Sequence, residues 1–227
     1  MPDPLPTLSP LERRVLGVLV EKAKTTPDAY PLTLNALVTG CNQKSNRDPV
    51  MNVDDADVQD ALEALQNKNL VILIQSSRVD RWRHGLYDAW TSDKVELAIL
   101  AELLLRGPQT EGELRTRASR MEPIDDLESL RTICKSLAER NFVVYLTPER
   151  SRGTTLTHGF HSPEELSVLR TRLSSGWPTD EVSAPPAPKP SAAPQRDLAA
   201  EVDQLKAELA RVSAMVAQLQ QALGVTP

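Results

Sequence analysis

The sequence predicts a mainly α fold with small β-hairpins, in which tandem winged-helix domains are followed by a linker and a C-terminal coiled-coil helix. Three observations support this prediction. Three segments with helical spacing of apolar residues precede a β-rich hairpin, the same order then repeats, and a heptad pattern occupies the end of the chain. No alternation of strand and helix indicates a parallel sheet.

The first domain is expected over residues 8–90. Its first helix begins with Ser9 as the N-cap and Pro10 as the first helical residue, and Glu12 completes a capping box. Two further helices and a pair of strands follow along the chain, at residues 33–43, from Asp54 onward, at 70–75 and at 79–90. This order is typical of a winged helix.

The second domain, expected over residues 91–175, repeats the order with different residues. Its first helix ends at Gly107 and Pro108, and Thr110 caps the next helix with Glu113 completing the box. A third helix, a hairpin and a trailing amphipathic helix follow, at residues 126–140, at 141–160 and from 162 onward.

Two segments of these domains carry a family resemblance. "EKAKTTPDAYPLTLNALVTGCNQKSNRDPVMN" and "LLLRGPQTEGELRTRASRM" resemble the two signature blocks of the bacterial YceH-like proteins, and the likeness runs from about Leu8 to Phe160. The resemblance implies two winged helices in this chain. The family has no accepted catalytic or ligand-binding residues, so the resemblance assigns no site.

The last part of the chain has a different composition. Residues 176–196 are rich in Pro, Ala and Ser and are expected to form a linker, and residues 197–224 are expected to form a coiled coil. Its apolar residues are spaced alternately four and three apart: Leu198, Val202, Leu205, Leu209, Val212, Val216, Leu219 and Leu223. We expect self-association through this stripe; the alternative is that the helix packs onto its own domains. The mixture of Val and Leu does not separate dimer from trimer.

The composition limits the classes of partner. With 26 Lys and Arg against 31 Asp and Glu in 227 residues, the formal charge is −5, so any surface that attracts nucleic acid must be local. No apolar run approaches the roughly 20 residues that cross a bilayer. The N-terminus lacks the features of a secretory signal. We therefore expect a cytoplasmic protein without a membrane partner.

No motif indicates an enzyme. The chain lacks a glycine-rich phosphate loop and the sequence signatures of serine hydrolases and zinc proteases. His84, His158 and His161 are scattered, and the last two are expected to point to opposite faces of a strand at the surface. Cys41 and Cys134 lie on apolar helical faces and are expected to fill the core. We expect no catalytic residue, no cofactor and no metal site.

The third helix of the first domain is unsuited to DNA. Several carboxylates precede its first basic residue, Lys68: Asp54, Asp55, Asp57, Asp60 and Glu63. They would repel phosphates in the usual docking mode of a winged helix. Contacts to nucleic acid or to a partner are therefore expected elsewhere, at Arg78, Arg81 and Arg83 of the first hairpin and at Arg150 and Arg152 of the second. The alternative is that these residues form a solvated sheet edge.

A long polar segment, "CNQKSNRDPVMN", separates the second and third helices of the first domain. Its two basic residues, Lys44 and Arg47, are candidate contacts for DNA or a partner. Asn42 and Asn46 are expected to cap the preceding helix, while Pro49, Val50 and Met51 are expected to pin the segment to the core.

Two functions remain open from the sequence. The first is a DNA-binding or regulatory protein that contacts phosphates through its hairpins. The second is an adaptor for protein–protein interactions that self-associates through its coiled coil. Fold analogy favours the first function. The acidic third helix of the first domain favours the second, as does that of the second domain, which opens with "EPIDDLE".

Overall fold

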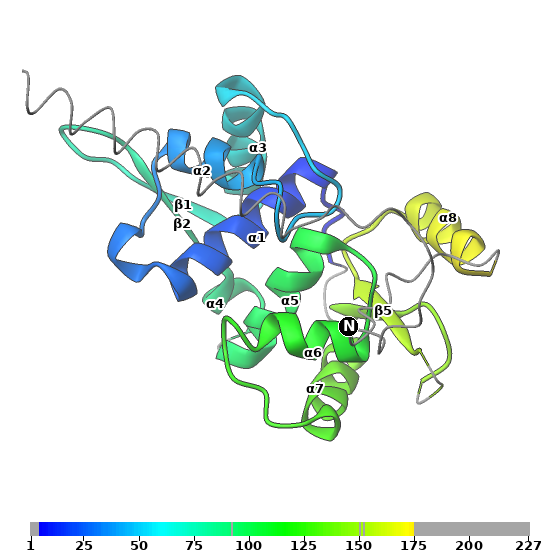
Figure 1. Cartoon of the computed structure of the whole chain (residues 1–227). Coiled ribbons are helices and arrows are strands. Elements are labelled where there is room, and N and C mark those ends of the chain that lie inside the picture. Colours follow the sequence, from blue (N-terminus) through cyan, green and yellow to red (C-terminus); the bar gives the residue numbers. More distant parts are fainter. Residues whose placement is uncertain (1–4, 92, 150, 152, 175–227) are drawn as a thin grey trace, which may run out of the picture. The chain divides into compact units, whose positions relative to one another are not determined.

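Three helices and a two-stranded antiparallel hairpin form the first half of the protein. The computed structural model of the chain describes residues 5–174 apart from 92, 150 and 152. The elements of this half are α1 (Pro10–Thr25), the 3₁₀ turn η1 (Pro27–Ala29), α2 (Leu34–Cys41), α3 (Asp55–Asn67), β1 (Val71–Ile74), β2 (Arg81–His84) and the short α4 (Leu86–Ala89). Strand β1 pairs with β2, and Leu32 forms an isolated bridge to Trp82 of β2. The hairpin extends outward beside α2 (Figure 1).

The second half repeats this plan. Its elements are α5 (Lys94–Arg106), β3 (Gln109–Thr110), α6 (Glu111–Ala118), α7 (Leu127–Glu139), β4 (Val143–Tyr145), β5 (Thr155–His158) and α8 (Pro163–Ser174). The strands form an antiparallel sheet in the order β3-β5-β4. In both halves, a short segment between the first and second helices pairs with the second strand of the hairpin. The described chain is thus mainly helical with small antiparallel sheets, and each half is winged-helix-like.

Local capping explains where the helices begin. The Ser9 hydroxyl accepts a hydrogen bond from the Glu12 amide at 3.2 Å, and the Glu12 carboxylate accepts one from the Ser9 amide at 2.7 Å. The same reciprocal pair joins Thr110 and Glu113 at the start of α6. Both capping boxes predicted from the sequence are confirmed, because a cap depends only on residues a few positions apart.

The predicted second strand of the first hairpin is too long. Strand β2 ends at His84, and the amide of the next residue, Gly85, donates a hydrogen bond to the Leu70 carbonyl at 2.8 Å. The chain then forms α4, which places Leu86 and Trp90 one helical turn apart, and both side chains are buried. The helical turn anchors the end of the hairpin in the core.

The two halves share one hydrophobic core. Helix α1 packs against α5, and a single cluster of buried residues extends through both halves. The helices approach so closely that a Cβ atom on Gly17 would lie 2.7 Å from the Cγ atom of Leu105. Backbone hydrogen bonds also join the halves, from the Asp48 amide to the Leu105 carbonyl at 3.1 Å and from the Leu8 amide to the Phe160 carbonyl at 3.1 Å.

Cys41 and Cys134 lie in this core as free thiols, as the sequence predicts. Burial raises the pKa of the Cys41 thiol to about 11 and that of Cys134 to about 12. Among the described residues, no helix combines the length and the apolar character needed to span a membrane.

We expect neither thiol to react with the disulfide reagent DTNB in the native protein at about pH 8, because both are buried and protonated. Absorbance of the released thionitrobenzoate measures the reaction. In guanidinium chloride both thiols should react at once, which serves as the control. Rapid labelling of the folded protein would show that the core opens near one of these residues.

Candidate functional site

The outward face of α3 is acidic. Its exposed side chains include the four carboxylates Asp55, Asp57, Asp60 and Glu63, while Val58, Leu62 and Leu65 are buried on the opposite face. The positive partial charge of a helix N-terminus, about half a unit, cannot offset four carboxylates that face closely spaced phosphates. This face therefore repels a nucleic-acid duplex.

A groove separates this acidic face from the first hairpin. Its walls carry apolar side chains from α2 and the hairpin, Leu34, Leu73 and Val79, together with the carboxylates Asp55, Glu63 and Asp80. None of the described residues that line it is a lysine, arginine or histidine. Val79, one of the exposed large apolar residues of the protein, is 45% exposed. The groove thus combines an apolar wall with uncompensated negative charge.

The predicted basic contacts on the hairpin are only partly available. Arg78 and Arg83 are exposed. Arg81 is half-buried, and its Nη1 atom donates to the Pro31 carbonyl at 2.8 Å. Arg81 therefore holds the hairpin against the turn before α2, and two of the three arginines face solvent.

In the polar segment, Lys44 is exposed but Arg47 is buried. The Arg47 Nη2 atom lies 2.6 Å from the Glu21 carboxylate and 2.8 Å from the side-chain oxygen of Gln43. Its Nε atom donates to the Gly40 carbonyl at 3.0 Å, near the end of α2. The expectation of a surface contact at Arg47 is corrected: a terminal carbonyl of α2 needs a donor, and this guanidinium supplies it.

Other expectations for this segment also change. Val50 is 58% exposed, so it does not pin the segment to the core; instead the buried Arg14 donates to the Pro49 carbonyl at 2.6 Å. Asn42 is the C-cap residue of α2, as expected, and its side chain forms two hydrogen bonds of 2.8 Å with the backbone of Val53. Asn46 adopts a positive φ of 58° and accepts a hydrogen bond from Arg120 of the second half. The segment is polar because its side chains satisfy buried backbone groups and link the two halves.

Several predicted contacts lie outside the described residues. These are Arg150 and Arg152 of the second hairpin, and the heptad residues from Leu198 to Leu223. The expectations for them stay predictions.

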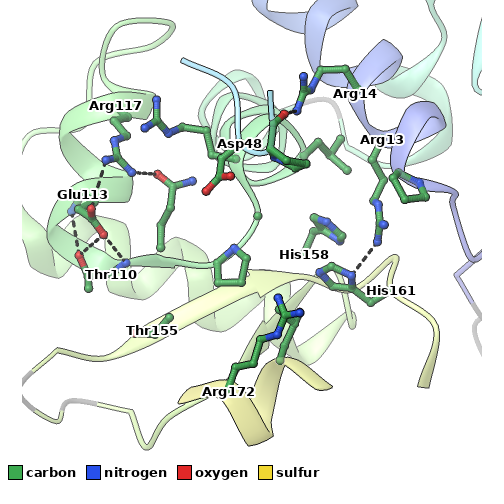
Figure 2. Close-up of a pocket in the computed structure, with 18 of the residues that line it drawn as sticks. Arg13, Arg14, Asp48, Thr110, Glu113, Arg117, Thr155, His158, His161 and Arg172 are labelled. Carbon is green, nitrogen blue, oxygen red and sulfur yellow. Dashed lines mark hydrogen bonds and ion pairs between the residues drawn. The ribbon is translucent and has the colours of Figure 1, made fainter. Parts of the chain in front are cut away.

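A cavity of about 340 Å³ lies where the two halves meet. It is lined by residues of α1, the segment around Asp48, α5, α6, β5 and α8 (Figure 2). The lining contains Arg13, Arg14, Arg106, Arg117 and Arg172, against the two carboxylates Asp48 and Glu113. A protein with a net charge of −5 thus has a cavity whose lining carries more arginines than carboxylates.

Two histidines of this cavity contradict the expectation that they point to opposite faces at the surface. His158 ends β5 and is 2% exposed, and the chain then turns through Gly159, so that the His161 ring stacks on it with 3.9 Å between centroids. The Arg13 Nη1 atom donates to His161 Nδ1 at 2.7 Å. Burial and Arg13 lower the pKa of His161 to about 4, and burial lowers that of His158 well below its usual value. Both rings are therefore neutral at neutral pH.

A metal site is not formed by these groups. Within residues 5–174, as far as they are described, no three His, Cys, Asp or Glu side chains are arranged to hold a metal ion.

Comparison with known proteins places these features in a family. A family model described as "Protein of unknown function, DUF480" matches residues 8–154. A UPF0502 protein of Rhodopirellula baltica is 49% identical over 191 residues, which cover 82% of this chain and 80% of that protein. A UPF0502 protein of Pseudomonas aeruginosa is 42% identical over 180 residues, which cover 79% and 80%. Subunit VPS25 of the endosomal trafficking complex ESCRT-II aligns over 68% of this chain and 99% of its own at 14% identity, with a TM-score of 0.22.

Proposed function

The chain belongs to the DUF480 family of bacterial proteins, which is described as a family of unknown function. We therefore propose a function from the site itself. The protein is a non-catalytic interaction module. Its groove between α3 and the first hairpin binds a basic, partly apolar segment of a partner protein.

Charge complementarity is the observation that carries this proposal. Asp55 and Glu63 on α3 and Asp80 on the hairpin line the groove, and no basic residue among its described lining neutralises them. Lysine and arginine side chains of a partner would be attracted by these carboxylates. The capping carboxylates Asp54 and Asp57 are bonded to the backbone of α3, so Asp55 and Glu63 can be changed without removing the helix cap.

The apolar wall of the groove supplies the second requirement. Leu34, Leu73 and the exposed Val79 offer hydrophobic surface next to the carboxylates. An amphipathic segment could pack its apolar side chains against this wall and direct its basic side chains toward the carboxylates of α3. This is a common mode of peptide recognition by a groove.

Nucleic-acid binding is the second candidate, since Arg78 and Arg83 are exposed on the hairpin. Arg78 is next in sequence to Val79, which lines the groove together with Asp55 and Asp80. A phosphate backbone that reached Arg78 would therefore also approach these two carboxylates. The repulsion weakens this mode, and we rank it below the peptide mode.

Self-association through the predicted coiled coil of residues 197–224 belongs to the same proposal. Two or more grooves on one assembly would bind a multivalent partner more tightly than a single groove does.

Neutralising the groove carboxylates is expected to weaken peptide binding. The probe is a fluorescent peptide that repeats Leu and Lys at helical spacing, titrated by anisotropy at low salt. The double variant Asp55→Asn/Glu63→Gln should bind it about fivefold to tenfold more weakly, because each exposed ion pair contributes up to about 1 kcal/mol. The matched control, Glu139→Gln/Glu149→Gln, removes two exposed charges from the second half and should bind as the wild type does.

Two outcomes would contradict the peptide mode. Equal losses in both double variants would show that only net charge matters. Affinity for a random DNA duplex that is stronger than for the peptide at about 50 mM salt, and that falls steeply as salt rises, would favour the second candidate.

A further inference from the structure

The basic cavity between the two halves has more positive than negative side chains, and some of its arginines are already paired. Arg13 forms two hydrogen bonds to the Glu165 carboxylate, at 2.7 and 3.0 Å. Arg117 donates to Gln109 at 2.8 Å and to Glu113 at 3.1 Å. These two residues shape the walls of the cavity, and their charges are locally compensated.

Arg106, in contrast, has no carboxylate within hydrogen-bonding distance among the described residues. Its nearest carboxylate oxygen, on Glu102, lies 3.8 Å from Nε, beyond hydrogen-bonding distance. Its guanidinium donates no hydrogen bond to the described part of the chain. Burial, followed by the neighbouring Arg117, lowers the pKa of Arg106, so this charge lacks full compensation inside the protein. An anion in the cavity would supply it.

Arg14 has the same character in a more buried position. It is 1% exposed, and its two Nη atoms donate to the carbonyls of Cys41 and Pro49. Its Nε atom is buried and has no hydrogen-bond partner in the described structure. Burial and the nearby Arg47 lower the pKa of Arg14. The charge of Arg14 therefore adds to the positive potential on one wall of the cavity.

His158 contributes a neutral donor. Its Nδ1 atom accepts a hydrogen bond from the Phe160 amide at 3.3 Å, so the neutral ring carries its proton on Nε2. The ring lies at the cavity, beside His161 (Figure 2), and only 2% of the residue is exposed. No group in the described residues accepts a hydrogen bond from Nε2. A nearly buried N–H donor thus faces a cavity whose walls are basic.

The geometry points to a binding site for a small organic anion, carrying a carboxylate or phosphate group, in the cavity between the two halves. Arg106 and the Nε2–H group of His158 hold the anionic group, and Arg14 adds positive potential behind them. Met51, Leu104 and Leu169, which also line the cavity, contact the carbon part of the ligand. A volume of about 340 Å³ lies within the range of sites for small molecules.

The fold gives such a ligand a defined effect. Its site includes residues of α1 and the polar segment from the first half, and of α5, α6, β5 and α8 from the second. A bound anion would therefore stabilise the contact between the halves. This site is separate from the groove of the proposed function, and each can fail without the other.

Thermal unfolding of the full chain with a panel of anions tests the inference. The probes are citrate, glycerol 3-phosphate and inorganic phosphate, each at about 10 mM, with sodium chloride at the same ionic strength as the reference. At least one organic probe should raise the Tm by several degrees. A larger rise with citrate assigns a carboxylate ligand, and a larger rise with glycerol 3-phosphate assigns a phosphate ester. A rise with inorganic phosphate alone, or with no probe, would overturn the inference.

Two variants locate the site. Arg106→Gln should weaken the affinity for the best probe at least tenfold by calorimetry, while Arg83→Gln, which removes an exposed arginine of the hairpin, should leave it unchanged. Leu169→Trp keeps every charge but fills part of the cavity, and it should also abolish binding; it serves if Arg106→Gln fails to fold by circular dichroism. Wild-type affinity in a folded Arg106→Gln or Leu169→Trp protein would show that the anion binds elsewhere.

Discussion

Replacement of Gly159 by alanine is expected to destabilise the protein by at least about 3 kcal/mol, or to prevent folding. The added Cβ atom would lie 1.8 Å from the carbonyl oxygen of Asn141, and no side-chain rotation can relieve a contact with backbone. The Gly159 amide also donates to the Phe142 carbonyl at 2.8 Å, so moving the chain would break this hydrogen bond.

The surroundings of Gly159 allow little adjustment. The next residue, Phe160, is fully buried and stacks on Trp90 with 4.4 Å between ring centroids. The preceding residue, His158, lines the cavity between the halves. Urea unfolding followed by tryptophan fluorescence would measure the loss, because Trp90 reports on this part of the core.

Gly112→Ala is the matched control for this change. Gly112 lies in α6, and a Cβ atom there would meet no other atom within 4 Å. Alanine should stabilise the helix by up to about 1 kcal/mol relative to glycine. If both variants unfold at the wild-type midpoint, the close approach at Gly159 does not exist in solution.

Removing the buried Arg47 should have the second largest effect. We expect Arg47→Ala to cost about 3–5 kcal/mol, because the largely buried Glu21 carboxylate loses its hydrogen-bonded partner and keeps only the Lys22 ammonium at 3.9 Å. The Gly40 carbonyl would lose its donor as well. Lys44→Ala is the control from the same segment: Lys44 is exposed, and the change should stay within about 0.5 kcal/mol.

A double-mutant cycle separates the ion pair from the rest of the effect. Glu21→Ala combined with Arg47→Ala should cost less than the sum of the single variants, since the double variant leaves no unpaired charge. Urea unfolding of the four proteins gives the coupling free energy. Strict additivity would mean that the two side chains do not interact in solution.

Local features of this fold were predictable from the sequence. The caps at Ser9 and Thr110 depend on a partner three residues away, so the pattern of residues specifies them. The acidic face of α3 was also predictable, because helical periodicity places Asp60 and Glu63 opposite the buried Val58.

Features that depend on distant partners were not predictable. Arg47 looks like a surface residue of a polar segment until Glu21, 26 positions earlier, is seen to approach it. Arg13, which lines the cavity, pairs with Glu165, 152 positions later. The cavity is lined by segments of both halves, so no local sequence motif predicts it. The stack of His158 and His161 results from the turn between them, which their spacing alone does not reveal.

The close packing of α1 against α5 at Gly17 has a consequence for attempts to produce either half of this protein alone. Repeated domains that have separate hydrophobic cores can be expressed one at a time. Here α1 of the first half and α5 of the second bury each other, so cutting the chain between the halves would expose an apolar helix on each fragment.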